Sequence, residues 1–202
     1  MTEPYITSIG PEKISMPIAT GSMTALRDGR IMWAWGHKQL WANHSSDGGR
    51  TWSNAVACKT SGGESIPNGG GVSLLRLASG KLALAQVSES GGDGLVSARQ
   101  FTYCTSEDEG DTWSIRVPIN PPGKREVLMM DCLVQLSTDR LILPCSAIMG
   151  PIPTPDDPAA AYRFGERFGN CWSYNTIFCF CYFSDDEGRT WCHKVVEAET
   201  FS

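Results

Sequence analysis

Residues 45–52, Ser45-Ser46-Asp47-Gly48-Gly49-Arg50-Thr51-Trp52, carry a pattern that this 202-residue chain repeats twice more. Its general form is Ser-x-Asp-x-Gly-x-Thr-Trp, and the other copies occupy residues 106–113 and 184–191. Five fixed positions that recur at long spacing predict a repeat architecture. The fixed residues are Ser45, Asp47, Gly49, Thr51 and Trp52, then Ser106, Asp108, Gly110, Thr112 and Trp113, then Ser184, Asp186, Gly188, Thr190 and Trp191.

Each copy predicts a tight turn between strands. The Asp side chain accepts hydrogen bonds from turn amides, and Gly adopts positive φ readily. Thr and Trp favour the start of a strand, and strand-like segments precede each copy at residues 40–44, 101–105 and 179–183. Carboxylates at 107–109 and 185–187 also suggest a calcium loop, but the spaced ligands and terminal Glu of an EF-hand are missing. We therefore predict turns and no metal site.

A second repeat precedes each turn motif. Residues 23–31, 74–82 and 133–141 each read as apolar strand, tight turn and apolar strand, with Asp-Gly, Ser-Gly and Thr-Asp at the turn. Each repeat therefore contains two hairpins and four strands, as propeller blades do. We predict an all-β, β-propeller fold in one partial domain over residues 1–202. Its blades are expected at about 14–60, 66–118 and 124–198.

Composition bears on whether the protein binds nucleic acid or membranes, and on the cell compartment in which it works. The formal net charge is −5, which argues against nucleic acid as a partner. No apolar run approaches membrane-spanning length, and residues 1–13 lack the apolar core of a signal peptide, so we expect a cytoplasmic protein that does not bind membranes. The eight cysteines include no Cys-x-x-Cys pair, and most fall in predicted strands. They are interpreted as small buried residues in a reducing compartment.

At this point the chain resembles the sialidase (neuraminidase) type of β-propeller. The three Ser-x-Asp-x-Gly-x-Thr-Trp copies correspond to the Asp-boxes, or BNR repeats, of that family, and the resemblance covers about residues 14–198. It implies an exo-acting glycoside hydrolase for a terminal acidic sugar, with three arginines on the sugar carboxylate, a Tyr nucleophile, an activating Glu and an Asp general acid. It implies no cofactor.

The sequence departs from that family at two expected positions. Where the family has its first arginine, this chain has Ala19-Thr20-Gly21-Ser22, and the family's acidic residue falls in a stretch, residues 36–41, that contains no carboxylate. No catalytic residue therefore transfers by motif. The alternative function is a non-catalytic propeller that binds carbohydrate or protein.

Family members usually close six blades, whereas three sheets expose their edges. We expect the missing C-terminal blades of a longer protein to complete the ring, or a second copy of the chain to do so.

If the propeller has a site, the starts of the inner strands, near Thr20, Asn68 and Asp131, meet at one mouth of the channel. Asp131 precedes an apolar strand, an unusual place for a carboxylate, and is our candidate acid or base; the competing interpretation is a turn cap or a partner of Arg125. Candidate substrate-binding residues from the same mouth and its loops are His37, Glu89, Arg99, Arg125 and Arg163.

Four tryptophans are candidate platforms for stacking on sugar rings. Trp33 and Trp35 share one strand face, and Trp41 and Trp172 lie in or near the connections between hairpins. We predict that they pack between blades instead, because large aromatic side chains dominate cores.

Overall fold

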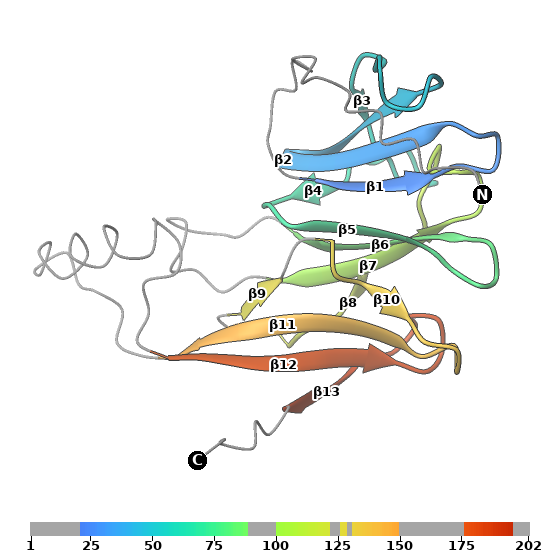
Figure 1. Ribbon diagram of the computed structural model, residues 1–202. Helices are drawn as coiled ribbons and strands as arrows, with labels where there is room; N and C mark the ends of the chain where they lie inside the picture. The colour runs from blue at the N-terminus through green and yellow to red at the C-terminus, as the bar shows by residue number, and fades with distance from the viewer. Residues whose placement is uncertain (1–20, 89–99, 122–125, 129–130, 150–175, 196–202) are drawn as a thin grey trace, which may run out of the picture.

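The computed structural model describes residues 21–88, 100–121, 126–128, 131–149 and 176–195. These residues form strands and turns and contain no helix. They build three antiparallel sheets that lie one above another in Figure 1. The prediction of all-β propeller blades is confirmed, whereas the blade boundaries and the total of six blades stay predictions.

The first blade contains β1 (Ser22–Ala25), β2 (Ile31–Ser45), β3 (Val56–Ala57) and the short β4 (Pro67–Asn68). β2 folds back on itself. Trp35 Nε1 donates a hydrogen bond of 2.7 Å to Asn43 Oδ1, although eight residues of extended strand span about 26 Å. The reversal occurs around Lys38, whose φ of 63° is left-handed. The two arms of β2 therefore supply two strands of the blade, and the predicted short connection is a bend within one element.

The second blade is regular. Its strands β5 (Val72–Arg76), β6 (Leu82–Val87), β7 (Phe101–Ser106) and β8 (Val117–Pro118) pair in chain order. The third blade contains β10 (Val134–Gln135), β11 (Leu141–Met149), β12 (Thr176–Ser184) and β13 (Cys192–Val195), and β9 (Glu126–Leu128) also pairs with β11. Hairpins and meanders of this kind are what the turn signals in the sequence predicted.

The cores lie between the blades. One cluster joins blades 1 and 2 and includes Leu26, Leu74 and Trp113. The other joins blades 2 and 3 and includes Leu77, Tyr103 and Leu133. Because side chains alternate along a strand, β6 contributes to both clusters and is buried along its whole length.

All three turn motifs, called corners from here on, have the same hydrogen bonds. The Ser hydroxyl donates to Asp Oδ1 at 2.7–2.8 Å and accepts from the Gly N–H at 2.8 Å. The Thr N–H donates to Asp Oδ1 at 2.9 Å, and the Thr hydroxyl donates to Oδ2 at 2.6–2.7 Å. Every Asp carboxylate is therefore occupied by donors from its own turn, which supports the turn interpretation of these acidic segments.

These donors make the folded state sensitive to acid. The backbone N–H of Thr190, together with the hydroxyls of Thr190 and Ser184, lowers the pKa of Asp186 to about 2, and the Thr51 hydroxyl lowers the pKa of Asp47 as well. An unfolded Asp has a pKa near 3.9. Since the folded pKa is the lower one, this stabilisation is complete above about pH 4 and is lost as the pH falls toward 2.

We expect the urea midpoint to fall steeply between about pH 4 and pH 2, and Asp186→Asn to make the fall shallower, because Asn does not titrate. Asp139→Asn, at an exposed hairpin position, is the matched control. Equal slopes for the wild type and Asp186→Asn would contradict the assignment.

Candidate functional site

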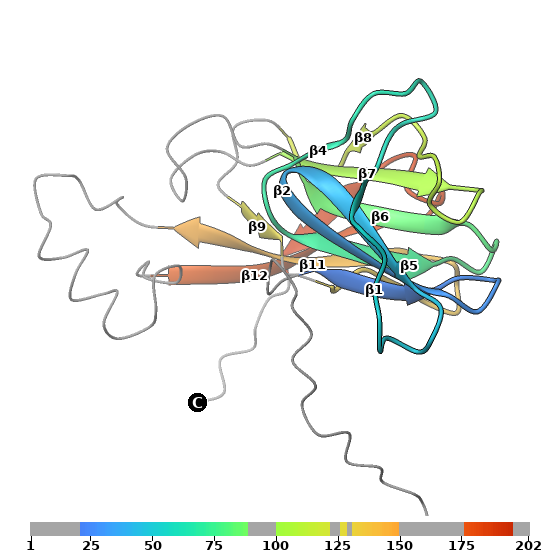
Figure 2. The ribbon, with the colours of Figure 1, turned by 90° about the horizontal axis from the view of Figure 1, so that it is seen from above.

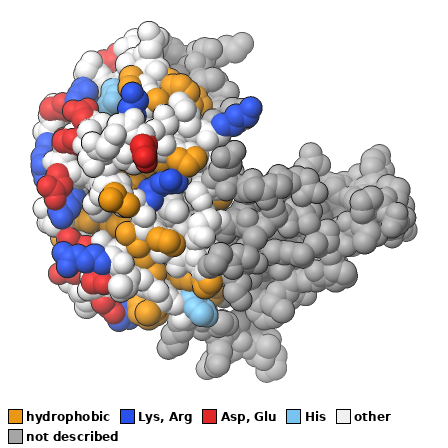
Figure 3. Space-filling model, turned by 180° about the vertical axis from the view of Figure 1, so that it is seen from behind, with side chains coloured by type: hydrophobic (Ala, Val, Ile, Leu, Met, Phe, Trp, Pro, Cys, Tyr) orange, Lys and Arg blue, Asp and Glu red, His pale blue; other side chains and the backbone are white. Residues whose placement is uncertain are grey.

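The two edges of the stacked sheets differ in character. The corners and first hairpins lie at one edge, where Lys and Arg side chains gather with Asp and Glu side chains (Figure 3). Arg76 of blade 2 contacts Glu109 at 2.6 Å, for example, and Arg27 of blade 1 reaches the same carboxylate at 3.6 Å. β1 and β5 point toward this edge, so their starts lie away from it (Figure 1 and Figure 2). The candidate Asp131 lies between β9 and β10, both of which pair with β11.

Asp131 lies in an interruption of the inner strand of blade 3. Leu128 pairs with Cys145, and Val134 pairs with Ile142, so the inner strand advances six residues while β11 advances three. Extra residues of this kind form bulges, which re-aim side chains and are common beside functional sites. Asp131 has a φ of 52°, and its side chain is exposed.

Asp131 joins the inner strands of all three blades. Its N–H donates to the Val72 carbonyl of blade 2 at 3.1 Å, and its Oδ1 accepts from the Ser22 hydroxyl of blade 1 at 2.5 Å. Ser22 Oγ in turn accepts from the N–H of Leu74 at 2.8 Å. This inner-strand site (Ser22, Val72 and Asp131) places one exposed carboxylate, held by a hydroxyl, where three blades meet.

The chemistry of this site is that of a hydrogen-bond acceptor or a single acid–base group. Canonical glycoside hydrolysis uses a pair of carboxyl groups, or a Tyr nucleophile in sialidases. Burial, followed by the negative charge of Asp131, raises the pKa of Cys132 to about 11, so the Cys132 thiol stays protonated at neutral pH. Cys132 is therefore a poor nucleophile there.

A buried amide network supports the neighbouring inner strand. Asn68 and Gln86 are fully buried, and Asn68 Nδ2 donates to Gln86 Oε1 at 2.8 Å. The N–H of Gly70 donates to Asn68 Oδ1 at 2.8 Å. Gly36 makes room for this amide, since a Cβ atom at position 36 would overlap with Asn68. The network fixes the approach to β5.

Sequence reasoning missed Ser22 and Gln86. A signal for Ser22 was present, because Ser22 and Ser73 hold the same place directly before the second repeat. Ser73 Oγ accepts from the N–H of Leu133 at 2.8 Å, just as Ser22 Oγ accepts from Leu74. Each of these serines therefore links one blade to the next.

Most other candidate binding residues cannot be placed against Asp131. Glu89, Arg99, Arg125 and Arg163 lie outside the described residues, as does Trp172. For His37 the backbone belongs to β2, and the side chain is not described. Their roles stay predictions.

Trp33, Trp35 and Trp41 pack against one another within blade 1, so the prediction that they pack between blades is wrong for them. Trp33 and Trp35 are 4% and 7% exposed. The ring centroids of Trp35 and Trp41 are 6.1 Å apart in a stacked arrangement, and Trp33 also meets Trp52 edge-on. Trp33 and Trp35 therefore offer no open face to a sugar, whereas Trp41 and Trp52 are half-buried.

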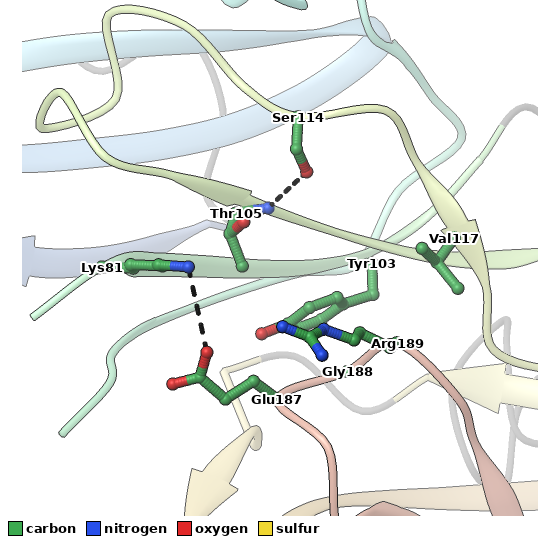
Figure 4. A pocket seen from close by; sticks show the side chains of 8 residues that line it. All are labelled: Lys81, Tyr103, Thr105, Ser114, Val117, Glu187, Gly188 and Arg189. Carbon is green, nitrogen blue, oxygen red and sulfur yellow. Dashed lines mark hydrogen bonds and ion pairs between the residues drawn. The ribbon is translucent and has the colours of Figure 1, made fainter. Parts of the chain in front are cut away.

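A small cavity opens between blades 2 and 3 at the corner edge (Figure 4). It is lined by Lys81, Tyr103 and Thr105 from blade 2 and by residues 187–189 from blade 3, among others, and its volume is about 120 Å³. Burial raises the pKa of Tyr103 above its ordinary value. The volume is well below the roughly 300–1,000 Å³ of typical ligand pockets, so we assign this cavity no ligand.

The described part of the chain also bears on metal binding, membrane spans and cysteines. It contains no group of three or more metal-capable side chains. It contains no helix long and apolar enough to cross a membrane. Cys58 and Cys104 are buried as expected, whereas Cys192 is exposed, because it lies on the edge strand β13.

Comparison with solved structures shows which fold the described sheets belong to. No protein-family model and no curated protein matches the sequence. Among solved structures, the α-L-arabinanase of Penicillium chrysogenum complexed with arabinobiose matches with a TM-score of 0.57 and 18% identity, over 91% of this chain and 50% of that chain. The fold is that of β-propeller blades. The α-L-arabinofuranosidase of Fusarium graminearum, in complex with an iminosugar inhibitor, matches with a TM-score of 0.54 and 17% identity, over 88% and 47% of the two chains.

A sialidase of Trypanosoma rangeli in complex with sialic acid also matches, with a TM-score of 0.36 and 13% identity over 87% of this chain and 37% of that chain. The chain spans about half the length of the two structures that score above 0.5.

Proposed function

We propose that this chain is part of a β-propeller glycoside hydrolase that removes a terminal sugar, with Asp131 as an acid or base. The observation that carries the proposal is the likeness to two structures whose names are those of an arabinanase and an arabinofuranosidase, one holding a disaccharide and the other an iminosugar. The exposed carboxylate at the meeting of three inner strands agrees with it.

The sugar takes one of two forms in this proposal. The corner repeats favour a sialidase-type substrate with a carboxylate. The two structural matches favour a neutral α-L-arabinosyl unit, and so does the absence of an arginine from residues 19–22, because a sugar carboxylate is best held by arginine. We rank the neutral sugar first.

The test is hydrolysis of a chromogenic α-L-arabinofuranoside and of a fluorogenic α-sialoside by the wild type and by Asp131→Asn. We expect the wild type to release the arabinofuranosyl group, and Asp131→Asn to lose about 100-fold or more in kcat, the usual loss when an acid–base group is removed. Asp139→Asn is the matched control, because Asp139 is also exposed and also has a left-handed φ, of 64°. Equal losses in both variants would remove Asp131 from the chemistry.

The second candidate is a propeller that binds carbohydrate without cleaving it. It is favoured by the stretch 36–41, which has no carboxylate, and by the hydrogen bond that already occupies one oxygen of Asp131. Saturable binding of arabinobiose by calorimetry, with no hydrolysis of either substrate, would replace the first proposal with this one.

A further inference from the structure

Blades 1 and 2 meet in one cluster, and blades 2 and 3 meet in another. Each of these meetings is called a junction. Comparing equivalent positions shows which residues of blades 1 and 3 lack the neighbour that their equivalents have. The first hairpins superimpose in their hydrogen bonds: the N–H of Gly29, Gly80 and Asp139 donates to the carbonyl of Leu26, Leu77 and Leu136, at 3.1, 2.8 and 3.0 Å. Residue positions in the three blades can therefore be compared one to one.

One repeat position lies on the face that each blade turns to the next blade. It holds Leu26, Leu77 and Leu136. Leu26 is 5% exposed and packs in the cluster with Leu74 of blade 2, and Leu77 is 2% exposed and packs in the cluster with Leu133 of blade 3. Leu136 is 42% exposed, and Val134 beside it is 44% exposed. Blade 3 thus leaves uncovered the side chain that blades 1 and 2 bury.

A second repeat position lies on the opposite face, which each blade turns to the preceding blade. It holds Met23, Leu74 and Leu133. Leu74 and Leu133 are 5% and 4% exposed, whereas Met23 is 52% exposed. The tryptophans of this face cover one another, so Met23 is its exposed large apolar residue. At the other two junctions, the residue at the Leu136 position packs in one cluster with the residue at the Met23 position of the next blade. Leu136 of blade 3 and Met23 of blade 1 are the two members of this pair that stay exposed.

The corner glycines show the same asymmetry. A Cβ atom on Gly110 would lie 2.9 Å from Met32 Sδ of blade 1, and one on Gly188 would overlap with the Tyr103 ring of blade 2. A Cβ atom on Gly49 would meet only Trp52 of its own corner, at 3.8 Å. The corner of blade 1 therefore has the free space into which a preceding blade fits.

We propose that the free face of blade 3 (Val134, Leu136 and Ile142) docks onto the free face of blade 1 (Met23 and the corner at Gly49) of a second copy of this chain. The same junction then forms twice, because each copy carries one face of each kind, and a two-fold pair closes. The length agrees, since the chain covers 50% and 47% of the two matched structures. Gly48 stands where Glu109 and Glu187 form ion pairs with the preceding blade, so this junction is held by apolar contact.

Sedimentation velocity of the 202-residue chain at 1–100 μM tests this docking. We expect a species of about twice the 22.0 kDa of one chain. Leu136→Glu is expected to weaken association at least 100-fold, because both junctions then bury an unpaired carboxylate. Its matched control is Ile115→Glu: Ile115 is 82% exposed, and its repeat counterparts Asn54 and His193 are exposed too, so association should not change.

A pair of opposite charges tests whether Met23 and Leu136 meet at the junction. Combining Met23→Lys with Leu136→Glu places opposite charges at both junctions and is expected to restore much of the association lost in Leu136→Glu. A wild type that stays monomeric at 100 μM overturns the proposal and indicates that other blades cover these faces. An open series of larger species overturns the closed pair, and a double variant that stays monomeric overturns the pairing of Met23 with Leu136.

Discussion

Gly188→Ala is expected to destabilise the protein by about 2–5 kcal/mol, one of the two largest effects that we predict. The φ of Gly188 is 85°, a left-handed conformation that costs an L-residue about 1–2 kcal/mol. The added methyl group would also overlap with the buried ring of Tyr103, and overpacking a core typically costs about 1–3 kcal/mol more. Urea unfolding followed by tryptophan fluorescence measures the loss.

Gly49→Ala is the matched control, because Gly49 holds the same corner position with a φ of 88° and has open space around it. In the undocked chain it is expected to cost only the strain, about 1–2 kcal/mol. In a Tyr103→Ala background the extra cost of Gly188→Ala should disappear, which a double-mutant cycle detects. Equal costs at Gly49 and Gly188 in the wild-type background would show that the Tyr103 contact contributes nothing.

Asn68→Ala is expected to cost about 3 kcal/mol. The substitution removes two hydrogen bonds of 2.8 Å and leaves Gln86 Oε1 and the Gly70 N–H without these partners. Each buried polar group that loses its partner costs about 1–3 kcal/mol. Because the network precedes β5, whose Val72 carbonyl accepts from Asp131, the same variant should also disturb the inner-strand site.

The control for Asn68→Ala is Asn54→Ala on the exposed corner edge, where a substitution usually changes stability by less than about 0.5 kcal/mol. Urea midpoints of the two variants at neutral pH give the comparison. A loss below about 1 kcal/mol for Asn68→Ala would mean that the amide network can be replaced by solvent, contrary to its burial.

The corners and hairpins were predictable because their chemistry is local. Within each corner the Ser, Asp, Gly and Thr lie within six residues of one another and satisfy their own hydrogen bonds, so the sequence pattern carries the structure directly. The number of strands per blade followed from the same turns. The fold-back of β2 at Lys38 was expected as a connection, although no Gly-containing two-residue turn marks it.

The site was only partly predictable because its contacts are distant in sequence. Asp131 was singled out for its unusual place before an apolar strand, but its partner Ser22 lies 109 residues away, and no local pattern encodes that pairing. The bulge around Asp131 could not be predicted from the sequence either, because it depends on the registers of β9 and β10 against β11.

All six residues of β6 are buried, so substitutions in this strand should be tolerated less well than substitutions elsewhere in the sheets. Leu82 and Leu84 face blade 1, whereas Ala83 and Ala85 face blade 3. This one strand therefore packs against both neighbouring blades. A size change there disturbs two junctions at once, whereas a change in an outer sheet disturbs one. Among these three blades, natural variation should therefore be smallest in the middle sheet.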